Sequence, residues 1–138
     1  MSLMNVFDVT KTGLVAQTSR LNLIAENIAN ADVESSTPEG AYRAQYPMFR
    51  AFFNEEQINA QGQGVRYEGA VDDTRAPKAL FDLGNPKAND EGYVFMSNVN
   101  TVEEMSNMMS ASRSYQTNVE VMNTAKQLLM RTLTLGQV

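Results

Sequence analysis

The acidic side chains come closer than any other group in this sequence to a catalytic arrangement. They occur as adjacent pairs at Glu55-Glu56, Asp72-Asp73 and Glu103-Glu104. Paired carboxylates act as acid and base when they flank a substrate from separate elements. Neighbours in a chain point in different directions on a helix and to opposite faces of a strand, so we interpret each pair as solvated surface. The sequence therefore predicts no catalytic residues.

Other catalytic and metal-binding chemistry is restricted by composition, because the chain contains neither cysteine nor histidine. Thiolates, disulfides, imidazole ligands and the usual general base near neutral pH are excluded. Asp90-Glu91 lacks the spacing of a calcium-binding loop, and Gly62-Gln63-Gly64 lacks the third glycine and the helix start of a phosphate-binding loop. We interpret both segments as turns and expect no cofactor and no metal.

The charge balance bears on the partners of the chain. It has 11 Lys and Arg against 16 Asp and Glu, a formal net charge of -5, so a nucleic-acid backbone would be repelled. No uncharged apolar run approaches the ~20 residues that cross a bilayer, and the amino terminus lacks a basic segment followed by an apolar one. We expect no nucleic-acid binding and no direct membrane insertion; these features alone would indicate a cytoplasmic protein.

Two long helices are predicted at the two ends of the chain. From Asn5 to Asp32 there is no proline, and apolar residues recur every seven positions at Phe7, Leu14, Leu21 and Ile28. These four residues would form one apolar seam along the helix. A second seam, also spaced by seven residues, is apolar at Ile24 and Ala31 but polar at Thr10 and Gln17. Asn5 with Asp8 predicts the start of this helix.

The second helix is predicted over residues 102–135, with Thr101 and Glu104 as a capping box. One seam contains Met108, Tyr115, Met122 and Leu129, and the other contains Met105, Val119 and Leu133. Such a helix is ~50 Å long, which exceeds what a domain of this size buries in its own core. We therefore expect both helices to need a partner.

The middle of the chain has a different composition, because all four prolines lie between residues 33 and 100. Short strands are predicted over 42–53, 65–71, 78–83 and 93–96, with a mobile loop near 54–64. The predicted fold class is mainly α with a small β insert. Residues 1–32 and 101–138 would form a discontinuous coiled-coil domain, and residues 33–100 a small β-rich outer domain.

Both terminal segments resemble signatures of the flagellar rod and hook family. Leu21 to Ala31 contains the pattern Leu-Asn-x-x-x-x-Asn-Ile-Ala-Asn-Ala, and residues 98–105 with 109–118 resemble the carboxy-terminal signature. The likeness extends over nearly the whole chain and is greatest to the proximal-rod members. Ser97 replaces a proline usual in the family, and we expect this to loosen the approach to the second helix.

The resemblance implies a structural subunit of the proximal rod, not an enzyme. Such a subunit is part of the drive shaft that transmits torque to hook and filament, and part of the export-channel wall. Implied partners are further copies of the chain, the rod proteins FlgB, FlgF, FlgG and FliE, and the flagellar type III export apparatus. The implied location is the basal-body rod crossing the periplasm, reached without a cleaved signal peptide.

The same resemblance, with the seams, indicates which residues take part in assembly. The predicted assembly interface consists of Phe7, Leu14, Leu21, Ile24, Asn27, Ile28, Asn30, Met105, Met108, Tyr115, Val119, Met122, Leu129 and Leu133. Asn118, Gln127 and Arg131 are predicted to face the central channel. Two alternatives are a cytoplasmic coiled-coil adaptor whose β insert binds a peptide, and a small hydrolase with an unrecognised carboxylate site.

Overall fold

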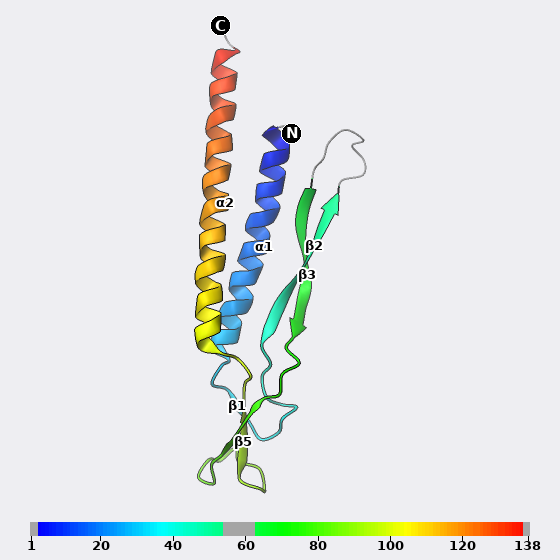
Figure 1. The fold of residues 1–138 in the computed structure, drawn as a ribbon, viewed down its shortest axis with the longest axis vertical. Helices are drawn as coiled ribbons and strands as arrows, with labels where there is room; N and C mark the ends of the chain where they lie inside the picture. The colour runs from blue at the N-terminus through cyan, green and yellow to red at the C-terminus, as the bar shows by residue number, and fades with distance from the viewer. Residues whose placement is uncertain (1–2, 54–62, 137–138) are drawn as a thin grey trace.

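The computed structural model describes residues 3–53 and 63–136, which form an elongated molecule (Figure 1). In chain order the elements are α1 (Leu3–Ala29), β1 (Glu34–Ser35), β2 (Gln45–Phe53), β3 (Gln63–Asp72), β4 (Lys78–Phe81), β5 (Tyr93–Met96) and α2 (Thr101–Leu135). The two helices run antiparallel and side by side. The prediction of two terminal helices around a small β insert is confirmed, and that of a coiled coil stays a prediction.

Helix α1 is the central element, because α2 packs on one side of it and the β2–β3 hairpin on the other (Figure 1). This explains why both of its predicted seams are covered: Thr10 and Ile24 are buried, and Leu14 and Leu21 are half-buried. A polar Thr10 is tolerated inside because its hydroxyl donates to the carbonyl of Val6. The predicted start was wrong, because α1 already begins at Leu3 and Asn5 lies within it.

Helix α2 buries small residues against α1. Ala111 and Ala125 are buried, and the Asn118 amide nitrogen lies 3.1 Å from where a Cβ on Gly13 would be. Small residues at a contact let two helix backbones approach closely. Met105 and Leu133 of the second predicted seam remain 55% and 64% exposed, so α1 does not cover them.

The β insert divides into two sheets. Strands β2 and β3 form a long antiparallel hairpin that lies along α1. The register shifts between Met48 and Phe49, because β3 has one extra residue there, Glu68, next to Gly69 at a φ of 137°. Strands β1, β5 and β4, in that order, form a second sheet beyond the ends of the helices. The four predicted strands are confirmed with shifted ends, while the two-residue β1 was not predicted.

Gly64 is a strand residue, although we predicted it in a turn and a mobile loop. A Cβ at this position would lie 2.6 Å from the Phe52 ring and 3.2 Å from the Thr12 hydroxyl. The Val65 amide also donates to that hydroxyl at 3.2 Å. Glycine therefore lets β3 approach both its partner strand and α1. The rest of the predicted loop, residues 54–62, lies outside the described residues.

A small apolar core lies where the helix ends meet the sheets. Ala31, Ala44 and Val99 are buried together, and Tyr42 and Tyr46 pack against them. These residues come from the end of α1, the approach to β2 and the approach to α2. The core therefore joins the end of α1 to the segments that lead into β2 and α2.

Neither helix, within the described residues, has a continuous apolar stretch of the length that a membrane span requires.

The tight α1–α2 contact predicts that Ala111→Leu destabilises the chain by about 1–3 kcal/mol, because the added methylene groups have no space between the helices. Urea unfolding followed by far-UV circular dichroism measures this. Ser110→Leu is the matched control, since Ser110 is exposed on the same helix. Equal unfolding free energies for the two variants would contradict the predicted helix contact.

Candidate functional site

Asn27 connects three separate parts of the fold through one fully buried amide. Its Nδ2 donates to the Gln45 carbonyl (2.9 Å) and to Glu104 Oε2 (3.2 Å). Its Oδ1 accepts from the Tyr42 hydroxyl (3.0 Å) and the Gln45 amide (2.9 Å). Both donor hydrogens and both acceptor sites of the side chain are thus used. The amide fixes α1 against β2 and against the first turn of α2.

Glu104 is a buried carboxylate held by two amides. Besides Asn27, the side chain of Asn107 donates to its Oε1 at 3.3 Å. Its place in the first turn of α2 puts negative charge beside the positive end of the helix dipole. Burial raises the pKa of Tyr42 above its ordinary value, and the nearby charges of Glu26, Asp72 and Glu104 raise it further. The Tyr42 hydroxyl therefore stays protonated and keeps donating to Asn27.

The predicted capping box at the start of α2 was wrong in its residues. Asn100 is the N-cap, and its side-chain oxygen accepts from the amides of Val102 (3.1 Å) and Glu103 (3.4 Å). Glu104 turns inward to Asn27 and does not reach back to Thr101 as the box requires. The sequence pattern therefore placed both the cap and the first residue of the helix one position too late.

The two residues before Val99 join the remaining segments to this network. Asn98 accepts from the Ala44 amide (2.8 Å) and donates to the Arg75 carbonyl (2.9 Å). Ser97 is buried, and its hydroxyl accepts from the Val99 amide (3.0 Å). This hydrogen bond ties the Ser97 side chain to the backbone two residues before α2 begins at Thr101, and a looser approach than with proline stays a prediction.

An ionic cluster lies next to these amides. Arg75 donates to Asp73 from its backbone amide (2.9 Å) and its Nε (2.6 Å), and from Nη2 to the Tyr46 hydroxyl (3.0 Å). The backbone hydrogen bond from Arg75, with its side-chain bond and charge, holds the pKa of Asp73 below its ordinary value. The Asp73 side chain is only 10% exposed, whereas Arg75 remains accessible to water. The cluster ties the end of β3 to β2.

The residues predicted for assembly fall into two groups. Phe7, Leu14, Leu21, Ile28, Met108, Val119, Met122 and Leu129 are half-buried, and Ile24 and Asn27 are buried. Asn30 closes the end of α1 by donating to the Glu26 carbonyl at 2.8 Å. Met105, Tyr115 and Leu133 remain exposed. Most of the set thus lies in contacts within the chain, and its role between subunits stays a prediction.

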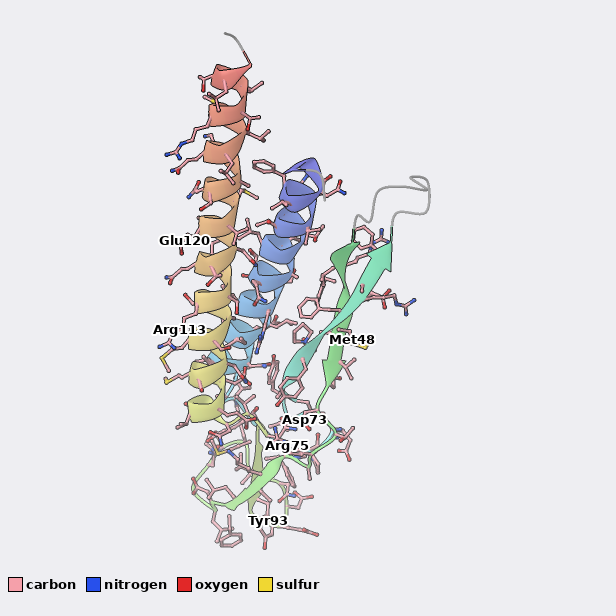
Figure 2. The ribbon with its side chains drawn as sticks, turned by 45° about the horizontal axis from the view of Figure 1, so that its top comes forward. Met48, Asp73, Arg75, Tyr93, Arg113 and Glu120 are labelled. Atoms are coloured by element: carbon pink, nitrogen blue, oxygen red, sulfur yellow. The ribbon has the colours of Figure 1, made fainter. Side chains whose placement is uncertain are left out.

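The three residues predicted to face a channel do not share one surface. Asn118 is half-buried against Gly13, so it lies on the side of α2 that meets α1 and not on the polar face predicted to line the channel. Gln127 and Arg131 are exposed. Arg113 and Glu120 of the same helix project on the side away from α1 (Figure 2). A channel-facing role for Gln127 and Arg131 stays a prediction.

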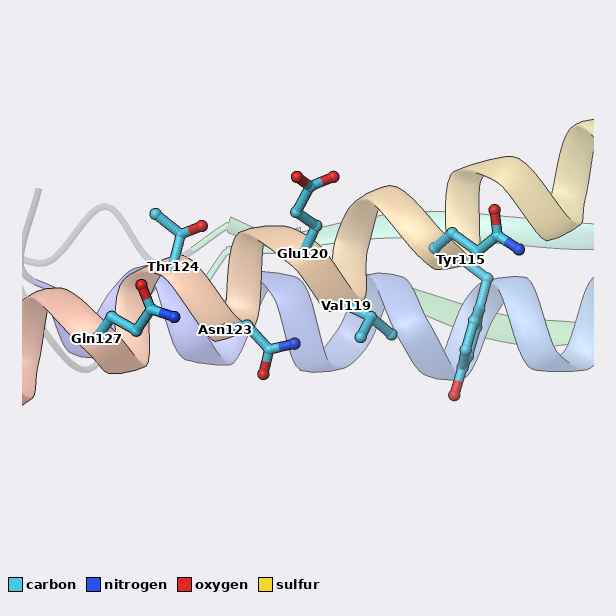
Figure 3. A pocket seen from close by; sticks show the side chains of 7 residues that line it. Tyr115, Val119, Glu120, Asn123, Thr124 and Gln127 are labelled. Atoms are coloured by element: carbon cyan, nitrogen blue, oxygen red, sulfur yellow. The ribbon is translucent and has the colours of Figure 1, made fainter.

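A shallow groove on α2 offers no arrangement for catalysis. Tyr115, Val119 and Asn123 lie on one side of the helix there, and Glu120 and Thr124 on the other (Figure 3). Glu120 is the single carboxylate among its lining residues, whereas acid–base hydrolysis uses two that converge. Within the described ranges 3–53 and 63–136, no three acidic residues cluster to hold a metal ion.

The geometry and the comparisons agree on the class of protein. The family model described as "Flagella basal body rod protein" matches residues 7–34, and that described as "Flagellar basal body rod FlgEFG protein C-terminal" matches residues 90–135. The two matches cover most of α1 and all of α2, including Asn27, Asn98 and Glu104. The class is therefore that of the flagellar axial proteins that build the basal-body rod.

Relatives of similar length define the family more closely. The chain is 46% identical to the flagellar basal-body rod protein FlgC of Yersinia enterocolitica, 45% to that of Escherichia coli O157:H7 and 43% to that of Salmonella typhimurium. Each comparison covers 99% of this chain and 100% of the relative. The chain belongs to the FlgC family of flagellar basal-body rod proteins. It is a structural subunit of the rod and not an enzyme.

The buried amide of Asn27 predicts a large effect of Asn27→Ala. The substitution leaves the Gln45 backbone groups and Glu104 Oε2 without their partner, at about 1–3 kcal/mol for each unsatisfied group. We expect the unfolding free energy to fall by about 3 kcal/mol or more. Denaturant titration measures it, with Asn22→Ala on the exposed side of α1 as control. A loss no greater than that of the control would refute the role of Asn27.

The depressed pKa of Asp73 predicts a defined pH dependence. A carboxyl whose pKa is lower in the folded chain stabilises it above the unfolded value, near 4, and loses this contribution as pH falls through the folded value. The stability advantage of the native chain over Asp73→Asn should therefore be full above about pH 5 and shrink below about pH 4. Thermal melts from pH 2 to 7 measure it. A constant difference across that range would contradict the prediction.

Proposed function

We propose that this rod subunit acts as part of the proximal drive shaft, with α1 and α2 paired as a coiled coil in the inner wall of a tubular assembly. The observation that carries the proposal is the junction at Asn27, where the two family signatures are joined by a buried hydrogen bond. A shaft transmits torque only if its subunits do not shear internally. The packing of α1 on α2 and the hydrogen bonds of the buried Asn27 amide would provide that resistance.

The amide network supplies register as well as strength. Apolar side chains slide past one another at modest cost, whereas four hydrogen bonds on one buried amide are satisfied in a single alignment. A displacement of α2 along α1 would leave the Glu104 carboxylate buried without its Asn27 partner. The network therefore fixes the position of α2 along α1, which a subunit that bears torque would need.

The terminal helices and the β insert would have different positions in the rod. We propose that residues 1–32 and 101–138 form the inner axial domain and residues 33–100 the outer one. The β2–β3 hairpin, which packs along α1, would brace the inner domain from outside. Gln127 and Arg131, exposed on the polar part of α2, would then line the channel through which later subunits pass.

Rod-family membership supports assembly with other rod components. We propose further copies of the chain, FlgB, FlgF, FlgG and FliE as the neighbours, and the type III export apparatus as the route of delivery. The basal-body rod is the location that the family supports, and a position crossing the periplasm belongs to the proposal. The net charge of -5 is consistent with contacts to proteins in preference to nucleic acid.

The proposal predicts the outcome of shortening α2. In a strain that lacks the native protein, a chain ending at Asn118 should leave α1 without half of its helical partner and should not restore rods or swimming. Electron microscopy of purified basal bodies and motility in soft agar measure this. Lys87→Ala, an exposed change in the β insert, should restore both. Complete rods and normal swimming with the shortened chain would overturn the proposal.

A further inference from the structure

The second sheet of the β insert ends on a strand with an open edge. In the order β1–β5–β4, strand β5 lies between the other two, so the outer edge of β4 pairs with no strand within residues 3–53 and 63–136. All four residues of β4, Lys78–Phe81, are exposed. The sheet lies beyond the ends of both helices, so neither helix covers this edge (Figure 1).

The register shows which backbone groups point to the outer edge of β4. The Asp82 amide donates to the Gly92 carbonyl at 2.9 Å, which makes these two residues a hydrogen-bonded pair. Hydrogen-bonded and non-hydrogen-bonded pairs alternate along an antiparallel ladder. Leu80 therefore bonds to β5, while the amide and carbonyl groups of Ala79 and Phe81 point away from it. A further strand would bond to these outward groups.

The features that usually close a sheet edge are used elsewhere. On the far side of β5, Asn89 already bonds to both backbone groups of Tyr93, at 2.9 Å and 2.8 Å. A lysine on an edge strand commonly discourages a further strand. The Lys78 ammonium, however, donates to the Val99 carbonyl at 3.2 Å, so it is directed toward the segment before α2. The outer edge of β4 therefore lacks this protection.

One face of the sheet at this edge is apolar and exposed. Phe81 and Tyr93 lie opposite each other on the two strands, with ring centroids 5.3 Å apart in an edge-on arrangement at one end of the molecule (Figure 2). Their exposed fractions are 57% and 39%, and that of Leu83 is 76%. A Cβ at Gly92 would lie 2.7 Å from Leu83 and 2.9 Å from Phe81, so glycine allows both side chains to lie against β5. A strand added to β4 would cover part of this apolar cluster.

The surroundings of the apolar cluster are acidic. Asp82, Asp90 and Glu91 are exposed in the loop that joins β4 to β5. The one basic residue of that loop, Lys87, donates from its ammonium to the Glu34 carbonyl of β1 at 3.2 Å. A complementary occupant would therefore carry lysine or arginine. A second copy of the chain is the poorer match, because its net charge is -5.

We propose that the outer edge of β4 binds an extended, basic segment of a partner protein by strand addition. The segment would pair its backbone with Ala79 and Phe81, as peptides do when they extend a sheet. Its alternate side chains would be apolar where they meet Phe81, and lysine or arginine would lie near the carboxylates. A short edge offers few hydrogen bonds, so the apolar and charged contacts must supply the rest of the affinity. The site is separate from the helix pair, so its failure would leave the proposed function untouched.

A designed peptide tests the site on the purified full chain. The probe is a capped peptide of alternating valine and threonine with lysine at both ends, and its counterpart has glutamate in place of lysine. In nitrogen–proton NMR spectra the lysine peptide should shift the amide signals of Ala79 and Phe81, with at least tenfold higher affinity than the glutamate peptide. Equal affinities, shifts confined to other residues, or no shifts at about 1 mM lysine peptide would overturn the inference.

Two substitutions at one position separate backbone pairing from side-chain effects. Ala79→Pro removes an outward amide and keeps the ladder to β5, because proline is tolerated on a free edge. It should weaken binding of the lysine peptide at least tenfold, whereas Ala79→Thr, which keeps the amide, should bind within twofold of the unsubstituted chain. Unchanged amide signals of Val94 and Met96 check that the sheet is retained. Equal affinities of the two variants would refute strand addition.

Charge reversal gives a test that does not depend on proline. The double substitution Asp90→Lys with Glu91→Lys should reverse the preference, so that the glutamate peptide binds more tightly. A retained preference for the lysine peptide would contradict the basic character of the occupant. Sedimentation without peptide tests the competing occupant: Ala79→Pro should leave the oligomeric state unchanged, and a dimer that this substitution dissociates would assign the edge to a second copy and overturn the proposal.

Discussion

One buried side chain determines how the parts of this protein are held together. The amide of Asn27 bonds to the approach to β2 and to the first turn of α2 at once, and an unsatisfied polar group at this depth would be costly. The helices therefore have one permitted alignment, which apolar packing alone would leave less defined. Asn98 and Asn100 extend the same principle to the segment before α2, where their side-chain oxygens accept from the backbone amides of Ala44 and Val102.

With that alignment set, α1 becomes the inner element of a three-layer arrangement. Thr12, Gly13 and Gly64 mark its closest contacts. The Thr12 hydroxyl accepts from the Val65 amide beside Gly64, and Gly13 lies against the Asn118 side chain. Both flanks of α1 are occupied by its own chain, on one side by α2 and on the other by the hairpin. Helix α2 has α1 on one side only, and its last turns extend beyond the start of α1 (Figure 1). Exposed apolar side chains nevertheless occur on all parts of the chain, on α2 as at Leu135 and in the β insert as at Phe81 and Leu83.

This distribution suits a subunit whose work is mechanical. The hydrogen-bonded interior at the Asn27 junction favours one alignment of the two helices, while α2 keeps exposed apolar side chains such as Leu128 and Leu135. The separation is physical: hydrogen-bonded buried amides specify one geometry, whereas exposed leucine, valine and methionine side chains gain most when a second surface removes them from water. The ion pair between Asp73 and Arg75 joins the end of β3 to Tyr46 of β2, beside the apolar core.

The spacing of apolar residues by seven predicted the two helices and the half-buried positions of Leu14, Leu21 and Met122. This was possible because the period of an α-helix is a local property of the chain. The turn at Asn89 was likewise local, since its side chain accepts from the amides of Glu91 and Tyr93. Tertiary structure alone decided which of several faces of α2 meets α1. Ala111 and Asn118 lie in that contact, and Met105 and Leu133 do not, because Ala111 and Gly13 opposite Asn118 let the helices approach closely. Tertiary structure also decided that the Glu104 side chain accepts from Asn27 and forms no capping box. A hydrogen bond between residues 77 positions apart produces no periodic pattern in the sequence, so it could not be predicted.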